Sequence, residues 1–96
     1  MTAYFIVDQI EVTDPDTMKT YSAGVMETVR QYGGKPVVRG GDFEVREGDW
    51  QPRRIIVLEF PDMDTLKNWY DGPEYADLKA MRLASSRSNA VMVEGA

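Results

Sequence analysis

Two acidic residues stand inside segments that are otherwise almost wholly apolar. Asp8 lies within "YFIVDQIEV" (residues 4–12), and Glu59 lies within "RRIIVLEF" (residues 53–60). A carboxylate in an apolar environment is costly unless a cation or hydrogen bonds compensate it, and without them its pKa rises. The two acids are therefore either salt-bridged or solvent-facing charges, or polar groups that converge on a cavity, where one could act as a general base. The cations that could pair with them are Arg39, Arg54 and Arg82.

Aromatic side chains with polar tips gather around a predicted break in a helix. In "WYDGPEY" (residues 69–75), Pro73 has no N–H and its ring crowds the preceding turn, so a helix through this segment must break or bend. Trp69 and Tyr75 flank the break, and Tyr21 lies on the apolar face of an earlier predicted helix. These rings either pack in the core around a kink or also line a cavity that the kink opens.

The residue types that are absent exclude several classes of chemistry. The chain of 96 residues has neither histidine nor cysteine, so it lacks the usual ligands of haem, zinc and iron–sulfur clusters. We expect no metal and no cofactor. The net charge of −5 opposes binding to phosphate groups, so neither nucleic acid nor a membrane surface is an expected partner. No run is long enough for a membrane span, the first residues do not resemble a signal peptide, and the lack of cysteine fits a cytoplasmic location.

The residue patterns predict alternating strands and helices. Strands are indicated by runs of β-branched and aromatic residues, and helices by apolar residues at spacings of three and four behind a capping aspartate. The predicted elements are a strand over 4–12, a helix over 15–32, a strand from 35, a strand over 53–60, a helix from 63 that breaks at Pro73, and a strand over 89–95. The order β-α-β-β-α-β is that of the ferredoxin-like α+β fold, with four antiparallel strands and both helices on one face. We expect one domain over residues 1–96.

The segment between the second and third predicted strands is ambiguous. Gly40-Gly41 is either a two-residue hairpin turn or a bulge within one long bent strand that turns at Gly48-Asp49, and we favour the bulge. "RGGD" (residues 39–42) has the composition of a phosphate-binding loop, but no helix follows it, so a turn or bulge is the better interpretation. Trp50 is expected to pack over its own domain or over a partner chain.

Three predicted strands are apolar on both of their faces. They contain residues 5–7, 55–58 and 90–93, whereas the helices of this fold cover only one face of the sheet. A second copy of the sheet is the simplest cover for the other face, so we expect a homodimer with the helix-free faces packed together. In the third strand, we expect Ile56, Leu58 and Phe60 to face the helices, and Ile55, Val57 and Glu59 to face the partner.

The sequence resembles a known family over nearly its whole length. The segments that carry the resemblance are "AYFIVDQIEVTDPDTMKTY", "YGGKPVVRGGDFEVREGDW", "RRIIVLEFPD" and "WYDGPEYADLKAMR". They are similar, in this order, to domain of unknown function 1330, of the dimeric α/β-barrel superfamily. One departure is Gly72, where the family often has serine. The resemblance implies the ferredoxin-like fold and a dimeric barrel; relatives in the superfamily include cofactor-free monooxygenases, haem-degrading enzymes and small-molecule isomerases.

Two classes of function remain open at this point. The first is a homodimeric module that binds a small organic molecule between helices and sheet. The second is a cofactor-free enzyme of the monooxygenase or isomerase kind, with Asp8 or Glu59 as the base and Arg39 or Arg82 holding an anion. The candidate ligand-binding residues are Asp8, Tyr21, Arg39, Glu59, Trp69, Tyr75 and Arg82.

Overall fold

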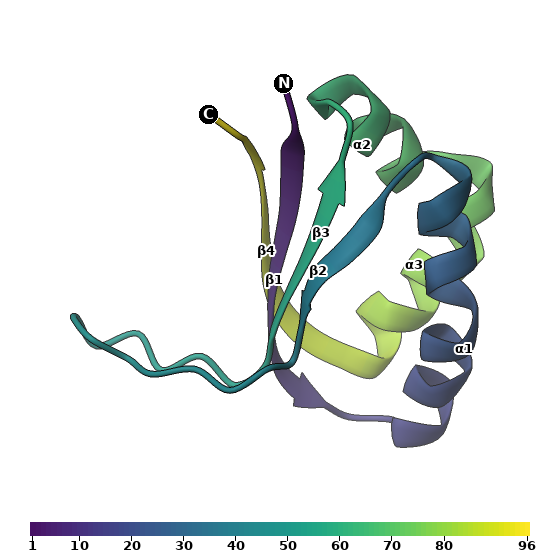
Figure 1. Cartoon of the computed structure of the whole chain (residues 1–96). Helices are drawn as coiled ribbons and strands as arrows, with labels where there is room; N and C mark the ends of the chain where they lie inside the picture. Colours follow the sequence, from purple (N-terminus) through teal and green to yellow (C-terminus); the bar gives the residue numbers. More distant parts are fainter.

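The computed structural model describes all residues from Met1 to Ala96. The elements in chain order are β1 (Ala3–Val12), α1 (Pro15–Gln31), β2 (Lys35–Arg39), β3 (Ile55–Phe60), α2 (Met63–Tyr70), α3 (Pro73–Ser85) and β4 (Ser86–Glu94). The strands form one antiparallel sheet in the order β2-β3-β1-β4. All three helices cover the same face of this sheet, and the opposite face carries no helix (Figure 1). The predicted ferredoxin-like α+β fold is confirmed.

Aspartates cap the helices where the sequence predicts them to begin. The side chain of Asp14 accepts a hydrogen bond of 3.2 Å from the backbone N–H of Thr17, and Asp62 accepts one of 2.7 Å from Thr65. Each bond satisfies a backbone donor that has no partner within its helix. Gly33 follows α1 with φ of +74°, a left-handed conformation that glycine adopts without strain.

The second helical region breaks at Gly72-Pro73, as predicted. α2 ends at Tyr70, and α3 starts again at Pro73 without a side-chain cap. Gly72 is buried, and a β-carbon placed there would lie 2.5 Å from the backbone oxygen of Asn68 and 2.9 Å from the Tyr32 hydroxyl. The break is therefore tightly packed, and a larger residue at position 72 requires the backbone to shift.

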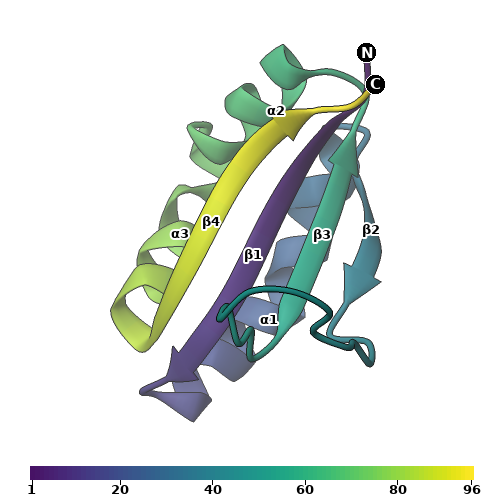
Figure 2. The ribbon, with the colours of Figure 1, turned by 90° about the vertical axis from the view of Figure 1, so that its left-hand side faces the viewer.

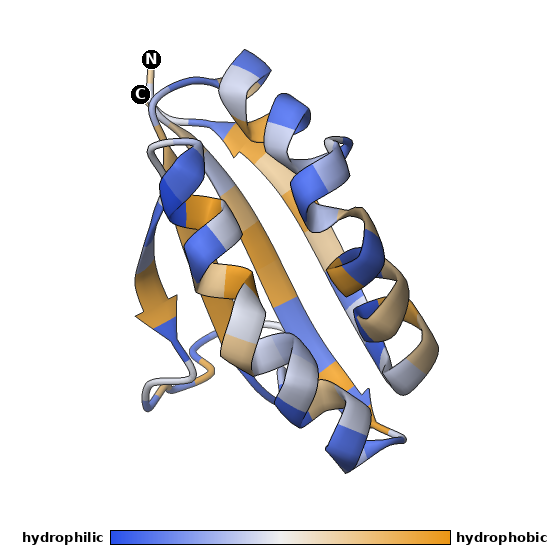
Figure 3. Ribbon diagram, turned by 90° about the vertical axis from the view of Figure 1, so that its right-hand side faces the viewer, coloured by the Kyte–Doolittle hydropathy of each residue, from blue (hydrophilic) through white to orange (hydrophobic).

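The core lies between the helices and the helix-facing side of the sheet. Alternate residues of β1 and β3, namely Phe5, Leu58 and Phe60, meet Trp69 of α2 and Tyr75 of α3. Figure 3 shows strands that are hydrophobic over much of their length behind helices with largely hydrophilic outer faces. The alternation predicted for β3 is confirmed, because Leu58 and Phe60 are buried in this core.

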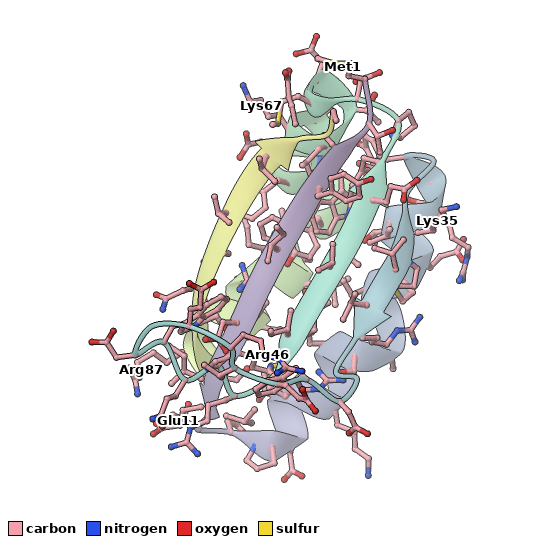
Figure 4. The ribbon with its side chains drawn as sticks, turned by 60° about the vertical axis from the view of Figure 1, so that its left-hand side comes forward. Met1, Glu11, Lys35, Arg46, Lys67 and Arg87 are labelled. Atoms are coloured by element: carbon pink, nitrogen blue, oxygen red, sulfur yellow. The ribbon has the colours of Figure 1, made fainter.

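Residues 40–54, here called the arm, differ from the prediction. β2 ends at Arg39, and no residue of the arm belongs to a strand, so the long bent strand is wrong. Gly40 takes φ of +70° and donates its N–H to the oxygen of Ile55, which turns the chain out of the sheet. The arm then projects from the helix-free side (Figure 1) and lies in front of the lower ends of β1 and β3 (Figure 2). Figure 4 shows Arg46 of the arm on this side of the sheet.

The last strand begins three residues earlier than predicted, because no loop separates it from α3. Ser85 and Ser86 donate side-chain hydrogen bonds of 2.6 and 2.7 Å to the carbonyl oxygens of Met81 and Arg82. These bonds satisfy carbonyls that the end of the helix leaves free. The chain can therefore pass directly from helix to strand, and Ser88 becomes part of the sheet.

Candidate functional site

A cavity of about 140 Å³ lies between the sheet and helices α1 and α3. Fourteen residues line it, and none of them is acidic. Phe5, Val25 and Leu58 are among the apolar residues of its wall. The residues of the wall with polar side chains are Gln9, Tyr21, Ser22, Arg39, Arg54, Arg82 and Ser88.

The register of the strands brings four of these polar residues to neighbouring levels of the sheet. Gln9 lies opposite Ser88 of β4, and its backbone N–H donates to the oxygen of Arg54 at 2.9 Å. Arg39 lies opposite Ile56, two residues beyond Arg54. Since side chains two residues apart in a strand share a face, Gln9 follows Phe5 and Val7 into the cavity. The polar end of the cavity is thus built from β1, β2, β4 and Arg54, the residue that precedes β3.

Helices α1 and α3 contribute a chain of hydrogen bonds. Tyr75 and Arg82 are seven residues apart on α3, which places them on one face of the helix. The Nε of Arg82 donates to the Tyr75 hydroxyl at 3.2 Å, and this hydroxyl lies 2.8 Å from the hydroxyl of Tyr21 on α1. Arg82 is 6% exposed and Tyr75 is 0% exposed, so the chain of bonds lies within the protein.

The burial of Tyr75 favours one direction for these bonds. Its hydroxyl has one proton, and the only acceptor bonded to it is the Tyr21 hydroxyl. Tyr75 accepts from Arg82, and either tyrosine hydroxyl can donate to the other. The buried proton of Tyr75 has an acceptor when it donates to Tyr21, and the proton of Tyr21 is then free to point into the cavity. Burial, together with Tyr75, raises the pKa of Tyr21, so its hydroxyl stays protonated. Burial opposes the charge of Arg82, but the hydroxyls of Tyr75 and Tyr21 outweigh it and raise the pKa of this guanidinium above its ordinary value.

The three arginines of the cavity have no acidic partner. The four ion pairs of the structure involve Arg30, Lys35, Arg46 and Lys79 as their cations. Arg54 donates instead to the side-chain oxygen of Gln9 at 3.4 Å. In addition, the hydroxyl of Ser88 is buried without a hydrogen-bond partner. The cavity therefore presents uncompensated positive charge and unused hydrogen-bonding groups.

The two acids predicted as candidate site residues lie on the other face of the sheet. Asp8 is buried, and its carboxylate accepts hydrogen bonds from the indole Nε1 of Trp50 at 3.0 Å and from the backbone N–H of Arg53 at 2.9 Å. Asp8 thus anchors the arm. Glu59 lies 3.9 Å from the Lys35 ammonium. Neither acid lines the cavity.

The anchoring by Asp8 gives a pH-dependent prediction. Burial raises the pKa of a carboxyl, but the bonds from Arg53 and Trp50 outweigh it and lower the pKa of Asp8 below its ordinary 3.8. This stabilisation is therefore complete above about pH 4 and is lost as the pH falls through the folded-state pKa. Asp8→Asn is expected to weaken the anchor by roughly 1.5–3 kcal/mol, because a charged acceptor is lost. The NMR signal of the Trp50 indole N–H should then shift at neutral pH towards its wild-type acid position.

Asp49→Asn is the matched control for this experiment. Asp49 is an exposed acid in the same arm and makes no side-chain hydrogen bond in the structure. Its replacement should leave the Trp50 indole signal and its titration unchanged. An Asp8→Asn protein whose indole signal still titrates like that of the wild type would contradict the anchor.

The structure brings together some of the predicted site residues and separates others. Tyr21, Arg39 and Arg82 line the cavity. Tyr75 and Trp69 do not line the cavity. Tyr75 is connected to it by its hydrogen bonds to Tyr21 and Arg82. Trp69 is buried in the core and stacks on the Tyr75 ring, with ring centroids 4.1 Å apart. The prediction missed the polar residues Gln9, Ser22, Arg54 and Ser88 as members of the wall. The alternation of β1 could have indicated Gln9, since it is in phase with Phe5 and Val7.

No group of three or more acidic, histidine or cysteine side chains could hold a metal ion in this structure. None of the helices combines the length and the apolar character that crossing a membrane requires.

The chain has the ferredoxin-like α+β fold, with a cavity between its helices and its sheet. The chain belongs to the family described as domain of unknown function (DUF1330), whose model matches residues 2–96. No curated protein matches the chain.

Solved structures share the fold at low sequence identity. A protein of unknown function from Rhodopseudomonas palustris matches with a TM-score of 0.76 and 13% identity, over 99% of this chain and 82% of its own. SnoaB, a cofactor-independent oxygenase from Streptomyces nogalater, matches with a TM-score of 0.71 and 13% identity, over 99% of this chain and 93% of its own. A dimeric ferredoxin-like protein of unknown function from a Jannaschia species matches with a TM-score of 0.70 and 18% identity, over 99% of this chain and 100% of its own. At these identities the likeness concerns the fold alone.

Proposed function

We propose that this protein binds a small organic molecule in the cavity between α1, α3 and the sheet. One observation carries the proposal: a largely apolar cavity in which buried polar groups converge, among them the unpartnered hydroxyl of Ser88. Buried polar groups normally have partners, and the hydroxyl of Ser88 is therefore available to bond a molecule that enters the cavity.

The size of the cavity limits the ligand to roughly one ring. Its volume is about 140 Å³. An engineered apolar cavity of about 150 Å³ in another protein binds benzene. A molecule of this size, with one or two polar substituents, therefore fits the space and its polar end.

The alternative, a cofactor-free enzyme with a strand-borne carboxylate as base, is less well supported. Asp8 and Glu59 lie on the helix-free face, and no acid lines the cavity. Apart from arginine, Tyr21 is the titratable residue of the wall, and its raised pKa makes it a donor rather than a base. The oxygenase activity of SnoaB belongs to a protein with 13% identity and does not transfer to this chain. Binding without chemistry is thus the function we favour.

Blocking the cavity tests the proposal. We expect members of a panel of small aromatic acids, amides and phenols to shift the backbone NMR signals of residues in the wall of the wild-type protein. Ser22→Phe should abolish these shifts, because Ser22 lies on an exposed part of the wall where a ring can occupy the space. Lys19→Phe places the same ring on an exposed position of α1 outside the cavity and should leave binding intact. A panel that shifts no signal, or equal binding by both variants, would rule out this cavity as the site.

The proposal includes a homodimer in which the helix-free faces of two sheets pack together. On this face, the strand pairing aligns one apolar row across all four strands, consisting of Val38, Val57, Ile6 and Val91. Val91 is 54% exposed and Val38 is 39% exposed in the single chain. The arm adds Phe43, Val45 and Trp50, also exposed, on the same side (Figure 1).

An exposed apolar surface of this extent is typical of a protein–protein contact. The Jannaschia protein, which shares the fold, is dimeric, and this agrees with the proposed assembly. We place the homodimer in the cytoplasm, where a chain without cysteine is unaffected by reducing conditions.

A further inference from the structure

We infer that the ligand of this cavity is a small organic anion of about the size of benzoate, with its carboxylate held by Arg82 and its apolar part against α1 and the sheet. The inference rests on the proposed binding function and adds the chemical class of the ligand.

The charge of the cavity is opposite to that of the whole chain. The protein has 16 acidic residues, 11 basic residues and a net charge of −5. The wall of the cavity nevertheless contains three arginines and no acid. A concave site of one sign, bounded by apolar walls, concentrates molecules of the opposite sign. Three arginines without counter-charges in one cavity of an acidic protein provide a site for an anion.

Arg82 is the residue that requires this anion most. It is 6% exposed, has no carboxylate within ion-pair distance and makes one side-chain hydrogen bond, from Nε to Tyr75. A buried cation gains further stabilisation from a counter-charge at hydrogen-bond distance. Tyr21 cannot supply the counter-charge, because burial keeps its hydroxyl protonated. Arg82 lines the cavity, and its terminal nitrogens make no hydrogen bond within the protein.

The hydrogen-bonding groups of the cavity also select an acceptor. When Tyr75 donates to the Tyr21 hydroxyl, the arrangement that the burial of Tyr75 favours, the proton of Tyr21 is free. Arg82 contributes further N–H groups, and the side-chain oxygen of Gln9 is already occupied by Arg54. A carboxylate accepts several hydrogen bonds and donates none, so it matches this set better than an amide or an alcohol.

The remaining arginines differ from Arg82 in exposure and in role. Arg39 and Arg54 are exposed residues at the edge of the cavity. Exposed cations contribute mainly to the attraction of an anion, and this contribution falls with ionic strength. Gly40 keeps space for one of them, because a β-carbon there would lie 2.6 Å from the Nε of Arg54.

The decisive test measures how strongly two probes of the same shape bind to the wild-type protein. Benzoate and benzamide are each titrated while the backbone NMR signals of the wall are followed. We expect benzoate to bind with the shifts concentrated at the cavity, and benzamide to bind at least about tenfold more weakly, because it lacks the charge that Arg82 attracts. Equal affinities for the two probes would overturn the inference but leave the binding function standing. Binding by no member of the aromatic panel, benzoate included, would overturn both.

Variants assign the effect to particular side chains. Arg82→Gln is expected to weaken benzoate binding by about tenfold or more, and Arg82→Lys to restore part of the loss. If the glutamine variant does not fold, the double variant Arg39→Gln/Arg54→Gln tests the inference instead, because both positions are exposed. This double variant should bind benzoate severalfold more weakly, and its affinity for benzoate should depend less on salt.

Arg30→Gln is the matched control. It removes an exposed arginine that pairs with Glu27 on α1 outside the cavity, and it should leave benzoate binding unchanged. Benzoate affinity that is the same in the wild type, the double variant and every folded Arg82 variant would show that the arginines of the cavity do not hold the anion.

Discussion

Val57→Asp is expected to convert the proposed homodimer into a folded monomer. Val57 lies in the centre of the apolar row on the helix-free face, between Val38 and Ile6. In the dimer this position is desolvated, and a carboxylate there costs roughly 3 kcal/mol or more, which raises the dissociation constant more than about a hundredfold. In the monomer the same carboxylate meets water, so the fold itself should survive. Light scattering at micromolar concentration measures the mass, and circular dichroism reports the fold.

Lys67→Glu is the control for this change. Lys67 is exposed on α2, on the opposite side of the sheet from the apolar row, and Figure 4 shows its side chain at one end of the molecule. This variant should remain dimeric, although it also adds negative charge. A wild-type protein that is monomeric at micromolar concentration would refute the proposed homodimer. A Val57→Asp protein that stays dimeric would show that the dimer interface lies on another surface.

Trp69→Ala is expected to cause the largest loss of stability of any single substitution considered for this chain. Trp69 is 0% exposed and lies among the rings of Phe5, Phe60 and Tyr75, with centroids 5.8, 5.2 and 4.1 Å away. Its indole N–H donates to the buried hydroxyl of Thr28 at 3.0 Å. Removing a buried tryptophan costs about 3–5 kcal/mol, a large part of the roughly 5–15 kcal/mol that holds a small protein folded. Chemical denaturation should show a midpoint far below that of the wild type.

Two variants separate the causes of that loss. Trp69→Phe keeps a ring in the core but removes the hydrogen bond to Thr28, and we expect it to cost about half as much or less. Trp50→Ala removes the other tryptophan, which is 59% exposed on the arm, and should lower the free energy of unfolding by less than about 1.5 kcal/mol. A similar loss in both alanine variants would show that the ring cluster is not the centre of the core.

The elements that local chemistry specifies were predictable from the sequence. The capping aspartates, the glycine after α1 and the break at Pro73 each act within a few residues, and the structure has all three where the pattern indicates them. The arm was less predictable, because its path depends on Asp8, a residue more than forty positions away that accepts bonds from Trp50 and Arg53. Neither partner gives a sign of this contact in the local sequence.

The candidate site was only partly predictable, for a related reason. An acid in an apolar strand is conspicuous, but the alternation of side chains along the strand decides on which face of the sheet that acid lies. Asp8 is out of phase with Phe5 and Val7, and Glu59 is out of phase with Leu58 and Phe60, so both point away from the cavity. Gln9, which is in phase, was missed because a glutamine near the end of a strand is common. The bond from Arg82 to Tyr75 follows from helical spacing, whereas the approach of Tyr21 depends on how α1 packs on α3.

The adjacency of Asp8 and Gln9 on β1 has a thermodynamic consequence. One side chain holds the arm on the helix-free face, and the next lines the cavity on the other face, so a single peptide unit belongs to both surfaces. In the proposed dimer, this peptide unit is a direct structural connection through which ligand occupancy and subunit association can be coupled. Linkage is reciprocal: by whatever factor dimerisation changes the affinity for the ligand, the ligand changes the affinity between subunits by the same factor.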